Sequence, residues 1–416
     1  MIVVNAASQM VALGAVLVVQ TLYMIVVARV LGPEDFGRFS FAWTIAQILL
    51  IGGDLGLHNT ALRKISTHPE RSAAFCKTFF GLKMALSAIL FLIAVLISLV
   101  IRETLETRIA LLLFGAGMFF HSLSLAINIV FQSHGKLYWA SLNVLTLFLA
   151  QFLFGILLLW WGARLIGLGV AYLSAACLSL ALNTFIFQRT IHPLRLERTA
   201  TWRRFAKESF PVGLGTLFHT VSARVGVALL TLLSGPYQAG IFAAANRITL
   251  SMSNVPIGIF SAILPVMASH QTDRAPVKRL FRKSLTVMIG ISVVLSIGFF
   301  LLAEPLVQFL YGPAYQLSVG NLQVLTWCLI PVFVGMSFSH VILSQSRLVA
   351  RLPVVTGAAM VANLGANSVL IPWMGSRGAA FSVLLTETVL AVGYALAVRS
   401  FLFSPVSPRP PTSGHS

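Results

Sequence analysis

Charged residues are scarce in this sequence, and acidic residues are the scarcest of them. Only 10% of the 416 residues are charged, with 11 Asp and Glu against 29 Lys and Arg. A soluble domain is about one quarter charged, so this chain cannot cover a water-facing surface. Hydrophobic residues make up 57% of it, in runs that reach the ~20 residues of a membrane crossing. We therefore predict an all-α, polytopic membrane protein.

Cysteine is also scarce, and its spacing excludes further classes of site. Cys76, Cys177 and Cys328 are scattered, with neither the close pairs of a metal site nor the density of a disulfide framework. No metal and no cofactor are predicted. The net charge of +18 does not indicate a nucleic-acid partner, because the basic residues lie in short segments between apolar runs and not on one folded face.

The apolar runs predict twelve membrane spans. The run from Ser8 to Val30 lacks a basic n-region and is too long for a signal peptide, so it is taken as the first span. Trp160 and Trp161, which suit a membrane interface, stand in a very short turn between spans five and six. The predicted spans cover residues 8–30, 37–57, 78–101, 109–131, 138–161, 163–187, 209–234, 240–268, 284–303, 320–343, 353–374 and 376–402.

Lys and Arg are distributed unequally between alternate loops. The segments after even-numbered spans, with the C-terminal tail, hold 20 of them, and the segments on the opposite side hold 6. Positive charge marks the cytoplasmic side, so both termini are predicted to be cytoplasmic. Residues 188–208 are predicted to be a basic cytoplasmic linker, either an amphipathic helix on an anionic leaflet or a plain connection. Residues 404–416, rich in Pro and Ser, are predicted to be a disordered cytoplasmic tail.

The two halves of the sequence resemble each other. Gly32-Pro33-Glu34-Asp35-Phe36-Gly37 follows span one, and Gly235-Pro236-Tyr237-Gln238-Ala239-Gly240 follows span seven. The Gly-Pro pair and the Gly recur at one constant offset, and at the same offset Phe39 and Ala42 match Phe242 and Ala245. Each copy contains six spans, an even number, so both begin on the same side of the membrane and an axis along the membrane normal should relate them. We expect six-helix lobes at 1–187 and 209–403 with a substrate cleft between them.

The segment Ala28-Arg29-Val30-Leu31-Gly32-Pro33-Glu34-Asp35-Phe36-Gly37 resembles the opening of polysaccharide-export flippases. Gly53-Asp54-Leu55-Gly56-Leu57 and Leu310-Tyr311-Gly312-Pro313-Ala314-Tyr315 are also similar to that family. Its members are Wzx-type O-antigen transporters of the multidrug/oligosaccharidyl-lipid/polysaccharide (MOP) superfamily. The resemblance implies a two-lobe, twelve-helix transporter, and no enzyme, in the cytoplasmic (inner) membrane.

The same resemblance implies a cargo and partners. The expected cargo is an undecaprenyl-diphosphate-linked oligosaccharide, moved from the cytoplasmic to the periplasmic leaflet during O-antigen, capsule or exopolysaccharide biosynthesis. Membrane lipids, a polysaccharide polymerase and a chain-length regulator are the expected partners.

Cations inside spans are the first candidates for binding such an anionic cargo. Arg224 and Arg247 lie deep in spans seven and eight, where a charge is costly and usually faces a cavity or a partner. Arg247, Ser251 and Asn254 share one helical face. We hypothesise that the arginines hold the diphosphate by charge-assisted hydrogen bonds. A structural ion pair or snorkelling is the alternative.

Polar stripes on other spans supply further candidates. Each stripe either contacts sugar hydroxyls or joins helices by hydrogen bonds. Asp54 and Glu387 are candidates for coupling to H⁺ or Na⁺, although Asp54 is also near enough to Arg63 or Lys64 for a local ion pair. The stripes are Ser40, Thr44, Gln47 and Asp54 in span two, and His121, Ser124, Asn128 and Gln132 in span four.

Three other classes of membrane protein fit less well. A cation-coupled multidrug exporter of the same superfamily needs an acidic residue in its cavity, yet spans one and seven contain no Asp or Glu. A major facilitator protein carries a basic Gly-Asp-Arg-type loop after span two, which is missing here. A membrane glycan polymerase or ligase needs large periplasmic loops with catalytic groups, whereas the predicted periplasmic loops of this chain are short. The sequence contains no Walker motif, so direct use of ATP is not predicted.

Overall fold

The computed structural model describes residues 2–68, 72–190, 202–253, 255–256, 274–344 and 348–403. Within these ranges all regular structure is helical. The helices are α1 (Ile2–Gly52), α2 (Leu57–Thr67), α3 (Ser72–Val100), α4 (Leu105–Ser133), α5 (Leu137–Trp160), α6 (Arg164–Thr190), α7 (Trp202–Ser234), α8 (Pro236–Ser253), α10 (Arg274–Leu301), α11 (Ala303–Tyr311), η2 (Pro313–Tyr315), α12 (Ser318–Thr326), α13 (Leu329–Ser344), η3 (Val349–Arg351), α14 (Leu352–Met374) and α15 (Ser376–Phe403).

Ten described stretches are long and apolar enough to cross a membrane. The first, Gly14–Thr67, has 54 residues, more than twice the ~20 of one crossing. It contains a break at Gly32, whose φ of 74° and ψ of 173° are not helical. Predicted spans one and two are the two parts of α1 on either side of this break. Span eight continues beyond α8 into residues 257–268, which lie outside the described ranges. The all-helical, multi-span fold is confirmed, and the count of twelve stays a prediction.

Two short helices lie where only connecting segments were expected. The predicted cytoplasmic segment 58–77 contains α2, which buries Leu57, Ala61 and Ile65 along one face at a spacing of four residues. The segment after span nine contains α11, which buries Ala303 and Val307. Both helices are too short for a membrane crossing, so a search for apolar runs of that length passes over them.

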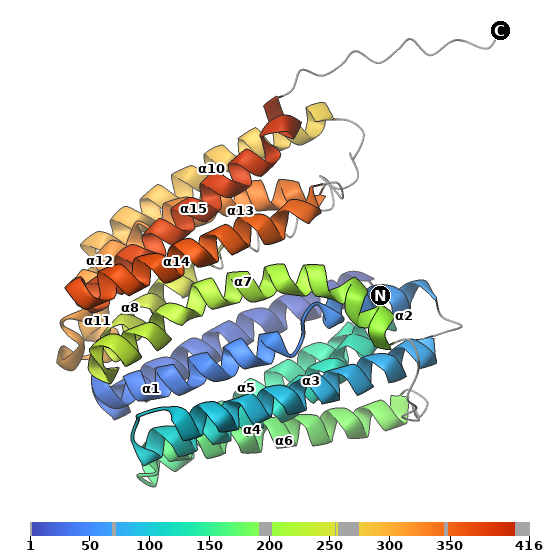
Figure 1. Cartoon of the computed structure of the whole chain (residues 1–416), viewed down its shortest axis with the longest axis horizontal. Coiled ribbons are helices and arrows are strands. Elements are labelled where there is room, and N and C mark those ends of the chain that lie inside the picture. The colour runs from blue at the N-terminus through green and yellow to red at the C-terminus, as the bar shows by residue number, and fades with distance from the viewer. Residues whose placement is uncertain are drawn as a thin grey trace.

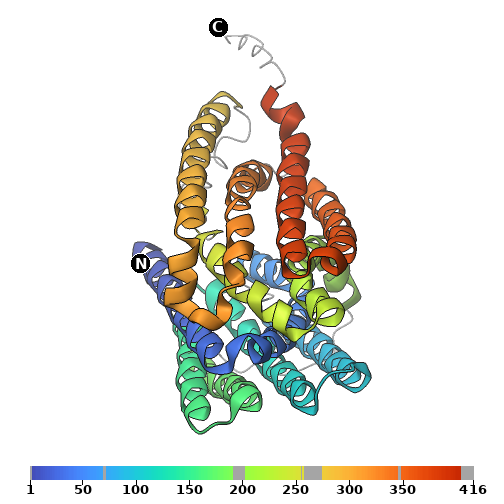
Figure 2. The ribbon, with the colours of Figure 1, turned by 90° about the vertical axis from the view of Figure 1, so that its left-hand side faces the viewer.

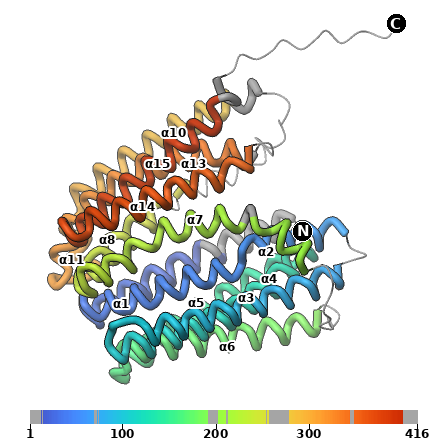
Figure 3. The backbone as a smooth tube through the Cα atoms, viewed as in Figure 1, coloured from blue at the N-terminus to red at the C-terminus, as the bar shows by residue number. Residues whose placement is uncertain are grey.

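The helices form two lobes. The first lobe, α1 to α6, runs from blue to green in Figure 1, and the second contains α7 to α15, with α7 and α8 next to the first lobe. α8 packs on α1, and α7 packs on both α1 and α14. The lobes are close together where α8 and α11 lie and diverge toward α2 (Figures 1 and 3). We call these the Gly-Pro end, which carries the Gly32-Pro33 and Gly235-Pro236 turns, and the α2 end.

A reciprocal backbone contact joins the lobes at the Gly-Pro end. A Cβ added at Gly37 would lie 1.8 Å from the carbonyl oxygen of Pro236, and one added at Gly240 would lie 1.8 Å from that of Pro33. These positions are equivalent in the two sequence repeats. Gly37 meets Pro236, and their equivalents Gly240 and Pro33 meet in the same way. Such a reciprocal pair of contacts is what a two-fold axis produces. The repeat predicted from the sequence therefore describes a real pseudo-symmetry at this contact.

A second contact at this end joins α1 to α11 and to η2. Arg29, near the break in α1, donates hydrogen bonds to the carbonyl oxygens of Phe309 and of Leu310, the latter at 2.7 Å. Tyr315 donates to the carbonyl oxygen of Ala28 at 2.8 Å. The two helix-terminal carbonyls of α11 would otherwise lack partners within their own helix. Arg29 therefore ties the first lobe to α11 of the second. The Gly-Pro end faces the viewer in Figure 2.

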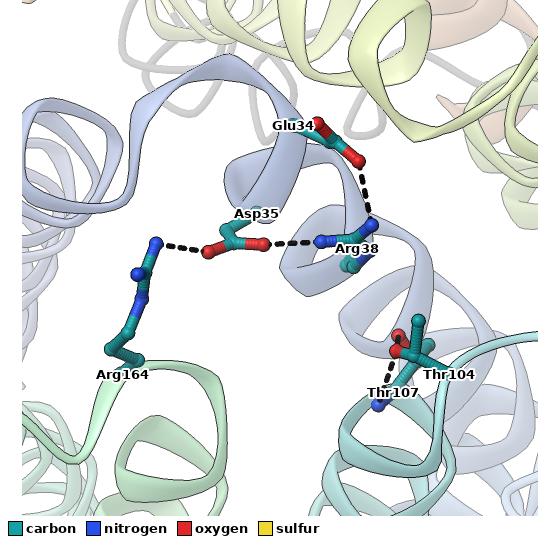
Figure 4. Close-up of polar contacts among 6 residues, drawn as sticks. All are labelled: Glu34, Asp35, Arg38, Thr104, Thr107 and Arg164. Carbon is teal, nitrogen blue, oxygen red and sulfur yellow. Dashed lines mark hydrogen bonds and ion pairs between the residues drawn. The ribbon is translucent and has the colours of Figure 1, made fainter.

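An ion-pair network stiffens the turn that follows Gly32. Asp35 pairs with Arg38 at 2.6 Å and with Arg164 at the start of α6, and Arg38 pairs with Glu34 at 2.6 Å (Figure 4). At the equivalent place in the second repeat, the side-chain oxygen of Gln238 accepts a hydrogen bond from the Ser376 backbone. Both repeats thus fasten the Gly-Pro turn to the corresponding later turn, by an ion pair in one case and a neutral hydrogen bond in the other.

Candidate functional site

A cavity of about 130 Å³ lies between the lobes, bounded by α1, α7 and α8. Polar groups from both lobes line it together with apolar side chains, and among the described residues no acidic side chain lines it. A cavity of this size has room for several waters or for part of a larger polar head group. Its polar lining residues are Ser40, Trp43 and Thr44 of α1, Arg224 of α7, and Asn246 and Arg247 of α8.

Arg224 and Arg247 are both lining residues of this cavity. Throughout the described ranges neither guanidinium forms an ion pair or a hydrogen bond with protein. The structural ion pair considered as an alternative is therefore absent from those ranges. Two unpaired cations beside one cavity create a field that attracts an anion, and an anion able to neutralise both would offset the cost of holding them at this depth.

Equivalent faces of the two repeats form the opposite walls. The positions Ser40, Trp43, Thr44 and Gln47 in α1 correspond to Ala243, Asn246, Arg247 and Leu250 in α8, at the offset that relates the two Gly-Pro turns. This spacing of three and four residues places each set on one face of its helix. The cavity thus lies about the pseudo-two-fold axis, although the chemistry of its walls differs.

Other predicted binding residues lie elsewhere. The hydroxyl of Ser251 donates to the Arg247 carbonyl at 3.0 Å, so this hydroxyl already has a hydrogen-bond partner within α8. Asn254 lies outside the described residues. Gln47 and Gln132 are partly exposed, but neither lines the cavity.

Asn128 belongs to a buried hydrogen-bond network inside the first lobe. Its side-chain oxygen accepts hydrogen bonds from Asn143 and Asn183, each at 3.0 Å. Ser124 and Ser179 complete the network, which joins α4, α5 and α6. All five side chains are buried. Of the two roles considered for the span-four stripe, the geometry supports helix packing for Asn128 and does not place it at the cavity.

Asp54 pairs with a residue that the sequence did not single out. Its carboxylate lies 2.7 Å from the ammonium of Lys83 in α3, whose side chain is only 2% exposed. Asp54 is thus in an ion pair, as in the alternative to the coupling role, but its partner is Lys83 and not Arg63 or Lys64. Lys64 instead contacts Glu208 at 2.8 Å. Lys83 comes 29 residues after Asp54 in the chain and reaches it through the packing of α3 on α1.

The Lys64–Glu208 contact fastens the start of α7 to the first lobe at the α2 end. The hydrogen bond from Lys64 is the main cause that lowers the pKa of Glu208 below its ordinary value. Nearby, the ammonium of Lys64 lies 5.2 Å from the ring centre of Phe205, which is 1% exposed. Phe205 and Glu208, at the end of the predicted linker, thus pack against the first lobe, while residues 191–201 lie outside the described ranges.

Glu387 lies midway along α15, away from the cavity. In the described part of the chain its carboxylate has no hydrogen bond or ion pair with another residue. A carboxyl group in a membrane-spanning helix without a cationic partner is unusual. Among the described residues no group of three or more His, Cys, Asp or Glu could hold a metal ion.

Trp43 and Asn246 are cavity residues that the sequence analysis missed. The signal was present, because Trp43 lies on the same face as Ser40, Thr44 and Gln47. In the sequence, small polar residues mark this stripe as a candidate binding face, whereas a tryptophan in an apolar run is more often a buried core residue. Only the packing of α1 on α8 shows that this face borders a cavity.

Solved structures of membrane transporters have a similar fold. The chain is similar to a multidrug resistance MATE family transporter of the MOP superfamily in an inward-facing conformation, with a TM-score of 0.75, 17% identity, and coverage of 94% of this chain and 98% of the other. It is also similar to the lipid II flippase MurJ in an inward closed conformation, with a TM-score of 0.74, 12% identity, and coverage of 94% and 87%. The chain therefore shares the fold of these two proteins.

Sequence similarity then identifies the family. The profile of the family described as polysaccharide biosynthesis protein matches residues 2–271, more than half of the chain. The chain belongs to this polysaccharide biosynthesis protein family. It is 24% identical over 309 residues to a protein of Escherichia coli (strain K12) named as an O-antigen transporter, covering 72% of each chain. It is 21% identical over 419 residues to an uncharacterized membrane protein in the cps region of Klebsiella pneumoniae, covering 94% of this chain and 80% of the other. The family predicted from Ala28–Gly37 is confirmed.

Proposed function

We propose that this protein is a flippase for an undecaprenyl-diphosphate-linked oligosaccharide, which it moves from the cytoplasmic to the periplasmic leaflet. The observation that carries the proposal is the pair of unpaired arginines, Arg224 and Arg247, beside one cavity between the lobes. The family and the similarity to a protein named as an O-antigen transporter support the polysaccharide cargo. The protein acts as a transporter and catalyses no covalent step.

The chemistry of the cargo matches the cavity. A diphosphate carries at least two negative charges, and the planar guanidinium of Arg can bind two phosphate oxygens at once. The polar head needs a passage through the bilayer core, whereas the prenyl tail can stay in lipid. The cavity lies about the pseudo-two-fold axis, where opening either end of the lobes would expose it to one side of the membrane in turn.

We further propose twelve spans with both termini in the cytoplasm. The α1 break, α8 and the other candidate helices support this count, and the excess of Lys and Arg in alternate segments supports the orientation. In this topology the α2 end is cytoplasmic and the Gly-Pro end is periplasmic. Residues 1–187 and 209–403 then form the lobes, with 188–208 as the cytoplasmic linker and 404–416 as the cytoplasmic tail.

Coupling to H⁺ or Na⁺ would use carboxylates outside the cavity. Glu387 is the stronger candidate, because in the described ranges it lacks a protein partner. Asp54 is the weaker one, because Lys83 already neutralises it. A cation-coupled multidrug exporter fits less well, since no acidic side chain among the described residues lines the cavity. One structural neighbour is named as a multidrug resistance transporter.

Replacing the cavity arginines tests the proposal. Neither arginine has an ion-pair partner in the described ranges, so its removal leaves no orphaned carboxylate there and the protein should still fold. We expect Arg247→Ala and Arg224→Ala to stop surface glycan production in a strain lacking the native gene, and lipid-linked repeat to accumulate on the cytoplasmic leaflet. The Lys variants should retain part of the activity.

An exposed arginine supplies the control. Arg282→Ala on α10 removes the same charge from a surface position and should export glycan normally. Expression in the membrane is measured for every variant. Full export by a well-expressed Arg247→Ala variant would refute the proposed role of the cavity.

A further inference from the structure

The two walls of the cavity have equivalent backbones but different chemistry. Thr44 occupies in α1 the position that Arg247 occupies in α8, and Trp43 is the equivalent of Asn246. Both cations therefore belong to the wall formed by α7 and α8, and the wall formed by α1 carries an indole and hydroxyls. A symmetric frame with unlike walls suits a ligand whose two ends differ.

The hydroxyls of the α1 wall are buried but unused. Ser40 is 8% exposed and Thr44 is 5% exposed, and neither side chain hydrogen-bonds to protein within the described ranges. Elsewhere in the spans such hydroxyls bond to the carbonyl four residues earlier, as Ser222 and Thr231 do at 2.9 and 3.0 Å. Two free hydroxyls beside a cavity are donors and acceptors that an uncharged polar ligand would satisfy.

The indole of Trp43 is held in a fixed orientation. It stacks on Phe39 with an interplanar angle of 12° and meets Tyr172 edge-on at 5.0 Å between ring centres. A further edge contact is made with Phe114 at 5.6 Å. Trp43 remains partly exposed at the cavity, and its indole N–H has no partner in the described part of the chain. It is therefore a rigid aromatic surface with a free donor.

An aromatic surface flanked by hydroxyls has the chemistry that recognises a sugar. A pyranose ring has C–H groups on one face, which pack on an aromatic ring, and hydroxyls on its edge, which hydrogen-bond to side chains such as Ser and Thr. A purely apolar ligand would leave Ser40 and Thr44 unpaired, at a cost. A small inorganic anion would use the arginines and leave the α1 wall empty.

We propose that Trp43, Ser40 and Thr44 form a subsite for the sugar attached directly to the diphosphate. This inference rests on the proposed function, in which Arg224 and Arg247 hold the diphosphate. The head group then bridges the lobes, with its phosphates on α7 and α8 and its first sugar on α1. A prenyl diphosphate without sugar contacts only one wall, so Trp43 distinguishes the glycosylated carrier from the bare carrier.

The test compares two ligands on one purified protein in lipid nanodiscs. The probes are farnesyl diphosphate and farnesyl diphosphate bearing one N-acetylglucosamine, and their dissociation constants are measured by calorimetry. We expect Trp43→Leu to weaken binding of the sugar-bearing probe about tenfold and to change binding of the bare probe less than about twofold. Trp43→Phe, which keeps an aromatic ring, should restore most of the difference.

Control variants separate the subsite from the phosphate site and from folding. Trp139→Leu removes an indole from α5, outside the cavity, and should leave both affinities unchanged. Arg224→Ala should weaken both probes alike. If Arg224→Ala weakens both probes but Trp43→Leu affects them equally or not at all, the sugar subsite is refuted and the phosphate site stands. If Arg224→Ala changes neither affinity, the proposed function itself fails, and the subsite that rests on it fails as well.

Discussion

Replacing Gly37 by alanine should force the lobes apart at the Gly-Pro end. The new Cβ would lie 1.8 Å from the carbonyl oxygen of Pro236, whereas real Cβ atoms essentially never approach closer than 3.0 Å. The two backbones must therefore separate by at least about 1.2 Å, the difference between these values. No flexible side chain can absorb this shift, because the opposing atom belongs to the backbone.

The energy of this clash gives the size of the effect. Adding one methyl group to a tight contact costs about 1–3 kcal/mol, which changes an equilibrium by about 5- to 150-fold. The penalty applies only to states in which the Gly-Pro end is closed. Gly37→Ala should therefore shift the population toward states open at that end. Gly240→Ala should have a similar effect, since it makes the equivalent contact with Pro33.

Spin-label distances would measure the shift. Labels at Trp161→Cys and Phe309→Cys, two exposed positions in different lobes, report on the Gly-Pro end after the three native cysteines have been replaced. We expect the distance distribution of Gly37→Ala to gain a longer component, and glycan export to fall. Gly290→Ala is the matched control, because a Cβ at that helical glycine meets nothing within 4 Å. An unchanged distribution in a folded Gly37→Ala variant would show that the reciprocal contact does not hold this end closed.

Three further predictions concern ion pairs and caps. Lys83→Met should lower the thermal stability of the purified protein, by about 3 kcal/mol or less because Asp54 is partly exposed, and a second change, Asp54→Asn, should restore most of it. Glu208→Gln should abolish a loss of stability seen on acidification. The pKa of Glu208 is lowered in the folded chain by Lys64, so its contribution is present above the ordinary pKa of about 4.5 and is lost as the pH falls below it. Arg29→Gln should weaken the tie to α11 and lengthen the same spin-label distance as Gly37→Ala.

Each of these predictions has an outcome that contradicts it. Equal melting temperatures for wild type and Lys83→Met would mean that the buried pair is energetically neutral. An identical dependence of stability on pH in wild type and Glu208→Gln would show that the Lys64 contact does not stabilise the α2 end. For Arg29→Gln the control is Arg102→Gln, and a distance change of the same size in both variants would point to a general effect of charge.

The helical spans and the internal repeat could be predicted because both are local properties of the chain. An apolar run of about 20 residues has to cross the bilayer as a helix, since its backbone polar groups find no water there. The Gly-Pro turns at 32–33 and 235–236 adopt positive φ at both glycines, a conformation that only glycine reaches without strain. The relation between these turns is visible in the residues themselves.

The candidate site could be predicted only in part. Arg224 and Arg247 were identified because a cation in an apolar run is conspicuous wherever the helix packs. Asn128 is also a candidate binding residue from the sequence, because polar residues that join helices and polar residues that bind a ligand follow the same helical periodicity. For Asp54 the sequence offers only the neighbouring bases Arg63 and Lys64 as ion-pair partners, whereas its partner in the structure is Lys83 of α3.

The sequence by itself determined the length, number and periodicity of the apolar segments, the charge asymmetry and the repeat. Hydrophobic transfer and backbone hydrogen bonding act within each segment, so these features need no knowledge of its neighbours. Tertiary structure alone decided which polar faces meet. Arg247 and Trp43 lie in different repeats, and only the packing of α1 on α7 and α8 places them beside one cavity, because contact between helices depends on their rotation and depth, which no local pattern specifies.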